Sequence, residues 1–576
     1  MAQYLGGRTL ERRIRVAMGA VEADLVLKQA AVPNLFTNEM IAADVAIADG
    51  YVAGIGEYAG REEIDCRGRY LCPAFIDGHV HIESTMALPG EFARAVIPHG
   101  TLTVIADPHE IANVCGLQGI RFFIDETERL PMTVYFMAPS CVPATPLEHN
   151  GAALAAADLA QLLDCPRVLG LGEVMDYIAV VQGQEEMMQK IGAFRPRPID
   201  GHLSGAFGRP ACAYAAAGIR TNHECSTPEE VLEYLRLGMY VQVRQGSSAK
   251  NLEMILTTAR QQQVCLDRLF FCTDDKHLDD IGREGHIIHN ARMALELGFS
   301  IYDVLRMASL NAARCYGLQE TGAVAPGYRA DLLILSDIHG LAIEKVLRGG
   351  EVVSSNGSEP DLPPPQPAEC VRDTVHIAPV SLRDLELWLA GDRANVISVI
   401  PAQLVTRLER TRVCARDGRF VPDGEFSKVA VIERHHATGR IGLGIVRGFG
   451  IENAAIASTV AHDSHNLIVV GDNDRDMLAA IEAVKQSGGG AYLVSGGQIR
   501  GGLPLPVAGL MSDLPASGIT SGLAGLAAMA HRCGVDERIE PLGMLSFLSL
   551  PVIPEGRITP DGLYDVLASR FIPVSV

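Results

Sequence analysis

Ala74-Phe75-Ile76-Asp77-Gly78-His79-Val80-His81 is a short apolar run that ends in two histidines placed two positions apart. Side chains alternate along a β-strand, so His79 and His81 point to the same side of the strand. Two neutral imidazoles that converge beyond the end of a strand form the beginning of a divalent-metal site. A pair of structural histidines is the alternative, and the rest of the chain decides between the two interpretations.

Seven further apolar segments follow, and each ends in polar residues before a stretch long enough for a helix. This alternation is typical of parallel βα units. Eight such units in about 250 residues predict an α/β fold built on a (β/α)8 TIM barrel, whose functional side chains collect at the carboxyl ends of the strands. The eight segments lie at residues 75–79, 103–107, 133–137, 168–173, 198–202, 220–223, 240–244 and 269–274.

The rest of the chain divides around this barrel. Short strands separated by turn residues flank it on both sides and predict a small β-domain, and a proline-rich linker at 359–367 separates an extra C-terminal domain. The predicted units are an N-terminal helical extension at 1–22, a β-sandwich-like domain at 23–71 and 321–358, the metal-dependent barrel at 72–320, and an α+β domain at 370–576.

Composition excludes several kinds of partner. The net charge of −20 argues against binding to nucleic acid or to an anionic membrane surface. No run of about 18 apolar residues is present, which predicts no membrane span, and the N-terminus lacks the apolar core of a signal peptide. The 13 cysteines show no paired spacing and are expected to be reduced thiols. Together these features predict a cytoplasmic protein.

Metal-type ligands gather at the predicted strand ends. Four histidines and two carboxylates are enough to hold two divalent ions that share a bridging carboxylate. Taken singly, each residue also has a structural interpretation, such as a core histidine or an ion-paired carboxylate, but six at successive strand ends favour a common site. The predicted ligands are His79, His81, Glu173, His202, His223 and Asp274.

The order of these ligands resembles that of the amidohydrolase superfamily and, within it, the bacterial adenine deaminase family. The resemblance covers about residues 25–576 and includes the exit from the barrel at 311–318 and 322–331. The segments that carry it most specifically are 78–84, 107–111, 172–175, 200–205, 222–225, 272–275 and, in the C-terminal domain, 461–466.

Two departures from superfamily patterns narrow the expectation. Many relatives bridge their metals with a carboxylated lysine from the fourth strand, but Glu173 takes that place here, which counts against a dihydroorotase-like or hydantoinase-like amidase. Related deaminases also carry a glutamate three residues after the fifth-strand histidine, where this chain has Gly205. The proton donor must therefore come from elsewhere, and the candidates are Glu83, Glu110 and Glu224.

The resemblance implies hydrolysis of adenine to hypoxanthine and ammonia, a reaction of purine salvage. A hydroxide held between two divalent ions attacks C6, while His223 orients the water and Asp274 moves its proton to the leaving amine. We assign protonation of N1 to Glu83, and substrate binding to His109, Glu110, Glu224 and Arg244. The expected ions are Mn²⁺, with Fe²⁺ or Zn²⁺ as alternatives, and the expected assembly is a homodimer or a higher homo-oligomer.

Other interpretations stay open at this point. Another cyclic-amidine or cyclic-amide hydrolase is the alternative within enzymes, and a catalytically silent barrel is the alternative outside them. Arg244 lines the pocket or forms a salt bridge at the barrel rim. The C-terminal cluster of His435, His436, His462, Asp463 and His465 is interpreted as a polar loop on the α+β core, with a metal site or a lid over the barrel mouth as alternatives.

Overall fold

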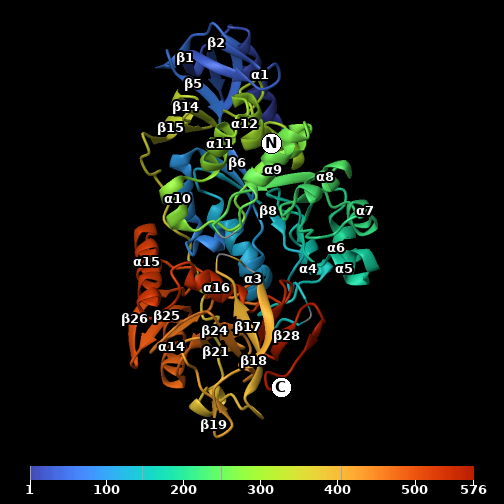
Figure 1. Ribbon diagram of the computed structural model, residues 1–576. Helices are drawn as coiled ribbons and strands as arrows, with labels where there is room; N and C mark the ends of the chain where they lie inside the picture. Colours follow the sequence, from blue (N-terminus) through green and yellow to red (C-terminus); the bar gives the residue numbers. More distant parts are fainter. Residues whose placement is uncertain (1, 146, 248, 402, 404) are drawn as a thin grey trace.

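The computed structural model describes residues 2–145, 147–247, 249–401, 403 and 405–576. Figure 1 shows three regions stacked along the long axis of the molecule. A small β-domain, in blue and yellow-green, lies at one end, a barrel occupies the middle, and an orange and red C-terminal domain lies at the other end. The first helix, α1 (Ala2–Ala17), lies against the small β-domain.

The small β-domain is built from both flanks of the barrel sequence. Its eight strands form one hydrogen-bonded sheet in the order β16-β15-β14-β5-β1-β2-β3, with β4 paired to β1. Strand β14 pairs with β5, and this antiparallel pair joins the two halves. The strands are β1 (Ala23–Asn34), β2 (Glu39–Ala48), β3 (Tyr51–Gly56), β4 (Gly60–Asp65), β5 (Tyr70–Pro73), β14 (Leu332–Asp337), β15 (Ala342–Arg348) and β16 (Glu351–Ser355).

A parallel strand forms at each of the eight predicted segments, which confirms a TIM-barrel-like fold. Strands β10-β9-β8-β7-β6 pair side by side, as do β11-β12-β13. The apolar residues alternate between an outer layer packed under helices and an inner cluster that includes Ile76, Ile105 and Phe270. The strands are β6 (Phe75–Val80), β7 (Thr101–Ala106), β8 (Thr133–Ala138), β9 (Val168–Val174), β10 (Ile199–Gly201), β11 (Thr221–Asn222), β12 (Tyr240–Arg244) and β13 (Leu269–Cys272).

Helices follow the strands and cover the outside of the barrel, as amphipathic segments with one apolar face do. Proline at the first turn and a Thr227–Glu230 capping box begin α8, for example. The helices are α2 (Pro89–Val96), α3 (His109–Thr127), α4 (Ala156–Ala160), α5 (Tyr177–Gln182), α6 (Glu185–Phe194), α7 (Arg209–Ala216), α8 (Pro228–Arg236), α9 (Leu252–Gln261), α10 (Leu278–Glu284), α11 (Ile287–Glu296), α12 (Ile301–Leu305) and α13 (Asn311–Cys315).

The first and last barrel strands meet at Asp274. Its backbone N–H donates to the carbonyl of His79 at 2.9 Å, and its carbonyl accepts from the N–H of His81 at 3.1 Å. Asp274 has a positive φ of 60°, a left-handed conformation that aspartate tolerates better than most residues. The chain therefore turns at the tip of β13 and brings this carboxylate beside the two histidines of β6.

The C-terminal domain is a second sheet of eight strands in the order β18-β17-β22-β21-β24-β23-β25-β26, with helices against it. A coil that includes the proline-rich segment 359–367 leads to it and packs on the barrel, where Gln366 N–H donates to Glu126 at 2.6 Å. Its elements are β17 (Arg393–Val399), β18 (Thr406–Arg412), β19 (Ala415–Arg416), β20 (Arg419–Phe420), β21 (Phe426–Ile432), β22 (Ile441–Arg447), β23 (Ala455–Ser458), β24 (Leu467–Gly471), α14 (Asp474–Ser487), β25 (Gly490–Ser495), β26 (Gln498–Pro504), α15 (Ala516–Arg532), α16 (Pro541–Phe547), β27 (Gly556–Thr559), β28 (Gly562–Asp565) and β29 (Arg570–Phe571).

This domain faces the carboxyl ends of the barrel strands, with α16 close to the blue α3 in Figure 1. The cavity at the barrel mouth is accordingly lined by residues of both parts. In the described part of the chain, no helix combines the length and the apolarity needed to cross a membrane.

Candidate metal centre and substrate cavity

The six predicted ligands converge at the carboxyl ends of the barrel strands. Five of them are buried, and His202 is partly exposed, with its side chain 25% accessible. Side-chain atoms of His79, His81 and Glu173 lie within 4.8 Å of one another, as do those of Glu173, His202 and His223. The structure therefore gathers two adjacent groups of metal-type ligands that share Glu173.

Glu173 lies between two pairs of histidines. Its Oε1 is 3.7 Å from Nε2 of His79 and 3.3 Å from Nε2 of His81. Its Oε2 is 2.6 Å from Nδ1 of His202 and 3.3 Å from Nε2 of His223. One carboxylate oxygen thus faces each pair, which is the arrangement that a carboxylate bridging two ions requires.

Asp107 holds Glu173 in this position. Its Oδ2 accepts from the backbone N–H of Glu173 at 2.9 Å, and its backbone carbonyl lies 2.8 Å from Nδ1 of His81. Gly172 makes the approach possible, because a Cβ at that position would collide with the Asp107 carboxylate. The carbonyl contact also fixes the tautomer of His81, whose Nδ1 carries the hydrogen and whose Nε2 is left as a ligand atom.

Asp274 joins the first pair of histidines to Arg244. Its Oδ1 lies 3.0 Å from Nε2 of His81 and 3.6 Å from Nε2 of His79. Its Oδ2 accepts from Nη1 of Arg244, which also donates to Glu224. Burial alone would raise the pKa of Asp274, but the adjacent guanidinium and histidines hold that pKa well below its usual value. Arg244 therefore lies inside the site and contacts both of these carboxylates.

Unpaired polar atoms mark the centre. Both ring nitrogens of His79 and Nδ1 of His223 are buried without a hydrogen-bond partner among the described residues. Buried polar atoms are rarely left unpaired, and each such atom calls for an explanation. A divalent cation bound to Nε2 of His79 and to the neighbouring carboxylates would satisfy that lone pair and the negative charge together, so the residues present fit two such ions.

Glu83 and Glu110 have different surroundings. Oε1 of Glu83 accepts from the backbone N–H of Ile111 at 3.1 Å, while Oε2 is buried without a hydrogen-bond partner in the described structure. Burial raises the pKa of Glu83 to about 7. Both oxygens of Glu110, in contrast, contact histidines of the C-terminal domain, His462 at 2.6 Å and His465.

His109 lies between Glu173 and Glu110. Its Nδ1 is 3.4 Å from Oε1 of Glu173, and its Nε2 is 3.4 Å from Oε1 of Glu110. Both residues begin α3 directly after β7, so the first turn of one helix carries them into the barrel mouth. His109 and Glu110 therefore connect the metal centre to the C-terminal domain.

The cavity in front of these residues has a volume of about 670 Å³, large enough for a small heterocycle. Barrel residues form one wall, and the C-terminal domain forms the other through mostly apolar side chains and a few polar ones. Lining residues of the barrel include His81, His109, Glu110, Glu173, His202, His223, Glu224, Arg244 and Asp274, and those of the C-terminal domain include His462, Asp463, Phe547, Leu550, Ile553 and Tyr564.

The interpretation of the C-terminal cluster as a polar loop on the α+β core is incomplete for His462 and Asp463, which both line the cavity at the barrel mouth, as the lid alternative expects. It holds for His435, whose Nε2 is 2.7 Å from the carbonyl of Ser464, and for His436, which contacts the carbonyl of Asn150. Sequence reasoning also missed Asp107. Its place in the quoted segment 107–111 was the only available signal, because its contact with Glu173 joins different strands.

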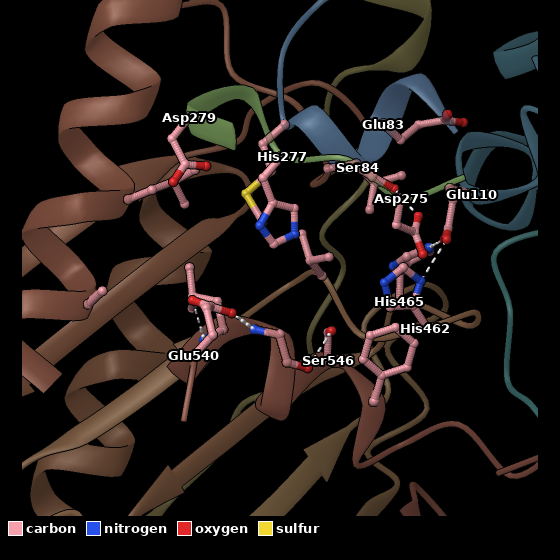
Figure 2. Close-up of a pocket in the computed structure, with 18 of the residues that line it drawn as sticks. Glu83, Ser84, Glu110, Asp275, His277, Asp279, His462, His465, Glu540 and Ser546 are labelled. Carbon is pink, nitrogen blue, oxygen red and sulfur yellow. Dashed lines mark hydrogen bonds and ion pairs between the residues drawn. The ribbon is translucent and has the colours of Figure 1, made fainter. Parts of the chain in front are cut away.

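A smaller cavity of about 140 Å³ adjoins the first, and Figure 2 shows the residues around it. Glu83, Ser84 and Asp275 come from the barrel, and His462, Glu540 and Ser546 from the C-terminal domain. Glu83, Glu110 and His462 border this cavity, and the last two also line the larger one.

Comparisons with known proteins agree with this architecture. Residues 70–353 match the model of the amidohydrolase family, and residues 403–570 match that of the adenine deaminase C-terminal domain. A crystal structure of an adenine deaminase is similar with a TM-score of 0.44 at 17% identity, over 57% of this chain and 99% of that chain.

Two curated relatives match almost from end to end. Adenine deaminase 2 of Carboxydothermus hydrogenoformans is 45% identical over 98% of this chain and 99% of its own length. Adenine deaminase of Geobacillus kaustophilus is 46% identical over 98% of this chain and 99% of its own length. Taken with the ligand set at the strand ends, these matches establish that the chain belongs to the adenine deaminase family of amidohydrolases.

Proposed function

We propose that this protein hydrolyses adenine to hypoxanthine and ammonia with the help of two divalent ions. Membership of the adenine deaminase family supports the substrate and the reaction. The observation that carries the two-ion centre is the position of Glu173, which faces His79 and His81 with one oxygen and His202 and His223 with the other.

The six side chains divide into two ligand sets. His79, His81, Asp274 and Oε1 of Glu173 would hold one ion, and His202, His223 and Oε2 of Glu173 would hold the other. When bound, the ions would lower the pKa of a water molecule and so supply the nucleophile for C6. Imidazole and carboxylate donors without a thiolate suit Mn²⁺, Fe²⁺ or Zn²⁺, and we propose Mn²⁺ as the native ion.

The chain's own residues would then move the protons. Asp274 would accept the proton of the attacking water and transfer it to the exocyclic amine, which leaves as ammonia. Glu83, whose Oε2 has no hydrogen-bond partner in the described structure, would protonate N1 so that negative charge does not build up on the ring. His223 would orient the water from the side of the second ligand set.

Three side chains would shape the substrate position. Arg244 links Asp274 to Glu224 and would fix both carboxylates relative to the ring. His109 lies 3.4 Å from Glu173 and would set the wall beside the ions.

Because each of the 13 cysteines is a free thiol, we further propose that the enzyme works in the reducing cytoplasm, in purine salvage. The homo-oligomeric state stays a prediction.

The test measures ammonia and hypoxanthine released by the purified full-length protein together with its metal content. Adenine is compared with adenosine, cytosine and cyclic amides. Equal amounts of ammonia and hypoxanthine from adenine, lost on chelation and restored by Mn²⁺, are expected. Turnover of a cyclic amide or of another base without turnover of adenine would instead favour another cyclic-amidine or cyclic-amide hydrolase.

A further inference from the structure

Glu110 is clamped between two histidines of the C-terminal domain. Oε1 of Glu110 lies 2.6 Å from Nδ1 of His462, and Oε2 contacts Nε2 of His465. Both histidines lie on the connection between β23 and β24, whereas Glu110 begins α3 of the barrel. Figure 2 shows the two imidazoles converging on this carboxylate. The proposed deamination mechanism assigns nothing to this cluster.

The protonation of His465 argues against an ion within the cluster. The backbone N–H of Ala461 donates to Nδ1 of His465 at 3.2 Å, so this nitrogen is an acceptor and carries no hydrogen. The hydrogen of the ring must then be on Nε2, the atom that faces Glu110. A ring nitrogen that carries a hydrogen has no free lone pair for a metal, so His465 acts as a hydrogen-bond donor to Glu110.

His462 presents its other nitrogen to the cavities. Nδ1 donates to Glu110, which leaves Nε2 on the far edge of the ring with no protein partner among the described residues. This nitrogen is not one of the fully buried unpaired atoms, so it is open to the space that His462 lines. The ring also stacks on Phe547, with centroids 4.6 Å apart and an angle of 22° between the planes. The imidazole is therefore fixed on two sides.

We propose that His462 is a substrate-binding residue supplied by the C-terminal domain, with Nε2–H donating to an acceptor nitrogen of the bound purine, and that Glu110 is its positioning residue. The proposal deepens the proposed function, because it takes the free base as the occupant of the cavity. N3, on the far side of the six-membered ring from C6, and N7, on the five-membered ring beside the exocyclic group, offer such acceptors.

The charges around His462 favour a donor. Burial alone would lower its pKa, but the Glu110 carboxylate raises it to about 9, and Asp275 and Asp463 add negative charge nearby. His465 faces the same carboxylate from the other side. At neutral pH Nε2 therefore carries a hydrogen, and it can pair with an unprotonated ring nitrogen but not with a ring N–H.

The experiment measures dissociation constants of hypoxanthine, 3-deazahypoxanthine and 7-deazahypoxanthine by calorimetry on the metal-loaded full-length protein. The product is used because it does not turn over. His462→Phe keeps an aromatic ring on Phe547 but removes the donor, and Glu110→Gln loosens the positioning of the imidazole. Thermal unfolding and bound metal are measured for each variant.

His149→Gln is the matched control. Nε2 of His149 contacts Asp561 at 2.7 Å, which is another imidazole–carboxylate contact between the barrel side and the C-terminal domain, but His149 does not line either cavity. If His462 served only to dock the C-terminal domain on the barrel, His149→Gln and His462→Phe would lose affinity for hypoxanthine to the same extent. A role in substrate binding would leave the control unchanged.

We expect His462→Phe to weaken hypoxanthine binding by at least about 10-fold, the usual scale for a lost hydrogen bond to a buried group. One of the two deaza compounds should bind the wild-type protein weakly but lose little further affinity in His462→Phe, because its acceptor is already missing. Glu110→Gln should show a smaller loss in the same direction.

Three results would overturn the proposal. Wild-type affinity of His462→Phe for all three compounds would exclude the contact. An equal loss of affinity for hypoxanthine in His149→Gln would show that the cluster is only an interface contact. Loss of one ion per chain in Glu110→Gln, but not in His149→Gln, would show that the cluster is a metal site. If wild-type protein binds no purine, the proposed function itself fails, which is a distinguishable outcome.

Discussion

Arg244 donates from Nη1 to Oδ2 of Asp274, while the other oxygen of this carboxylate lies 3.0 Å from Nε2 of His81. The same guanidinium nitrogen contacts Glu224. Asp274 is thus held from two directions, by a fixed cation on one side and by the ligand histidines on the other. The rotation of the Asp274 side chain is therefore restricted before any substrate arrives. This fixes the direction in which its carboxylate would transfer a proton.

Arg244→Lys should lower kcat by about 10- to 100-fold, because a strongly hydrated ammonium group on a flexible stem does not hold the two carboxylates in the fixed positions that the planar guanidinium gives them. Steady-state kinetics with adenine measure the effect. Arg268→Lys serves as the control, since Arg268 stacks on Tyr240 and donates to the carbonyl of Gly238 outside the cavity. An unchanged kcat in Arg244→Lys would contradict the proposed role.

Asp274→Asn should reduce kcat by at least about 10²-fold and leave the KM for adenine nearly unchanged, because the variant loses a general acid and base but not the cavity wall. Initial rates over a range of adenine concentrations separate the two parameters. If the whole loss falls on KM, Asp274 binds substrate and does not transfer protons.

Glu173→Gln should lower the bound metal and the activity together. An amide carries no negative charge and presents only one acceptor oxygen, so it cannot bridge two cations. Elemental analysis of the purified variant gives the number of ions per chain. Glu126→Gln is the control, a buried carboxylate on α3 that accepts from a backbone N–H far from the ligands. Two tightly bound ions and normal turnover in Glu173→Gln would refute the bridge.

Glu83→Gln should keep both ions and lose kcat, because its Oε2 is a buried carboxyl oxygen that is free to donate a proton, with no hydrogen-bond partner in the described structure. Glu110→Gln and Glu224→Gln provide the comparison, since these carboxylates are already bound to histidines and to Arg244. Metal content and kcat are measured for all three variants. If Glu224→Gln keeps both ions and loses kcat while Glu83→Gln stays active, Glu224 is the proton donor and Glu83 is not.

A pair of carboxyl groups between the barrel side and the C-terminal domain should make stability fall as the pH rises from about 4.5 to about 8. Burial and the nearby Asp463 raise the pKa of Glu148 from 4.5 to about 8, so the folded protein holds a proton that the unfolded chain has lost. The free energy of unfolding therefore decreases as the pH rises through this window. Below pH 4.5 both states are protonated, and the contribution is fully present.

Glu148→Gln should flatten this dependence, because an amide does not titrate. Thermal unfolding measured across the window compares the variant with wild type and with Glu425→Gln, whose carboxylate pairs with Arg447 at the surface. Equal slopes for Glu148→Gln and wild type would show that the pair contributes nothing to the pH dependence.

The barrel and the clustering of six metal-type side chains at its mouth could be predicted because their signal is local. Period-two alternation placed His79 and His81 on one side of a strand, and the strand-to-loop transitions at Glu173, His223 and Asp274 marked the end of the barrel where sites form. For Arg244 the sequence left two alternatives, a cavity-lining residue or a salt bridge at the barrel rim, and it did not identify Asp274 as the partner, since the pattern fixes a strand end but not what lies across it.

Residues that meet through domain docking could not be predicted in the same way. His462 lies in an irregular connection, and its distance from Glu110 depends on how the second sheet packs over the barrel. No periodicity encodes that packing. Asp107 was not predicted for a related reason: its contact with Glu173 depends on the absence of a side chain at Gly172, which lies on β9, two strands away from β7.

The shared wall of the cavity has a consequence for the order in which the protein matures. A chain grows from its N-terminus, and domains fold as units while synthesis continues. The last of the six ligands, Asp274, precedes His462 and Phe547 in the sequence, so the ligand set is complete while the barrel mouth still lacks its second wall. In the proposed mechanism, ions would then enter through an open mouth, and the later arrival of the C-terminal domain would enclose the cavity that we assign to the base.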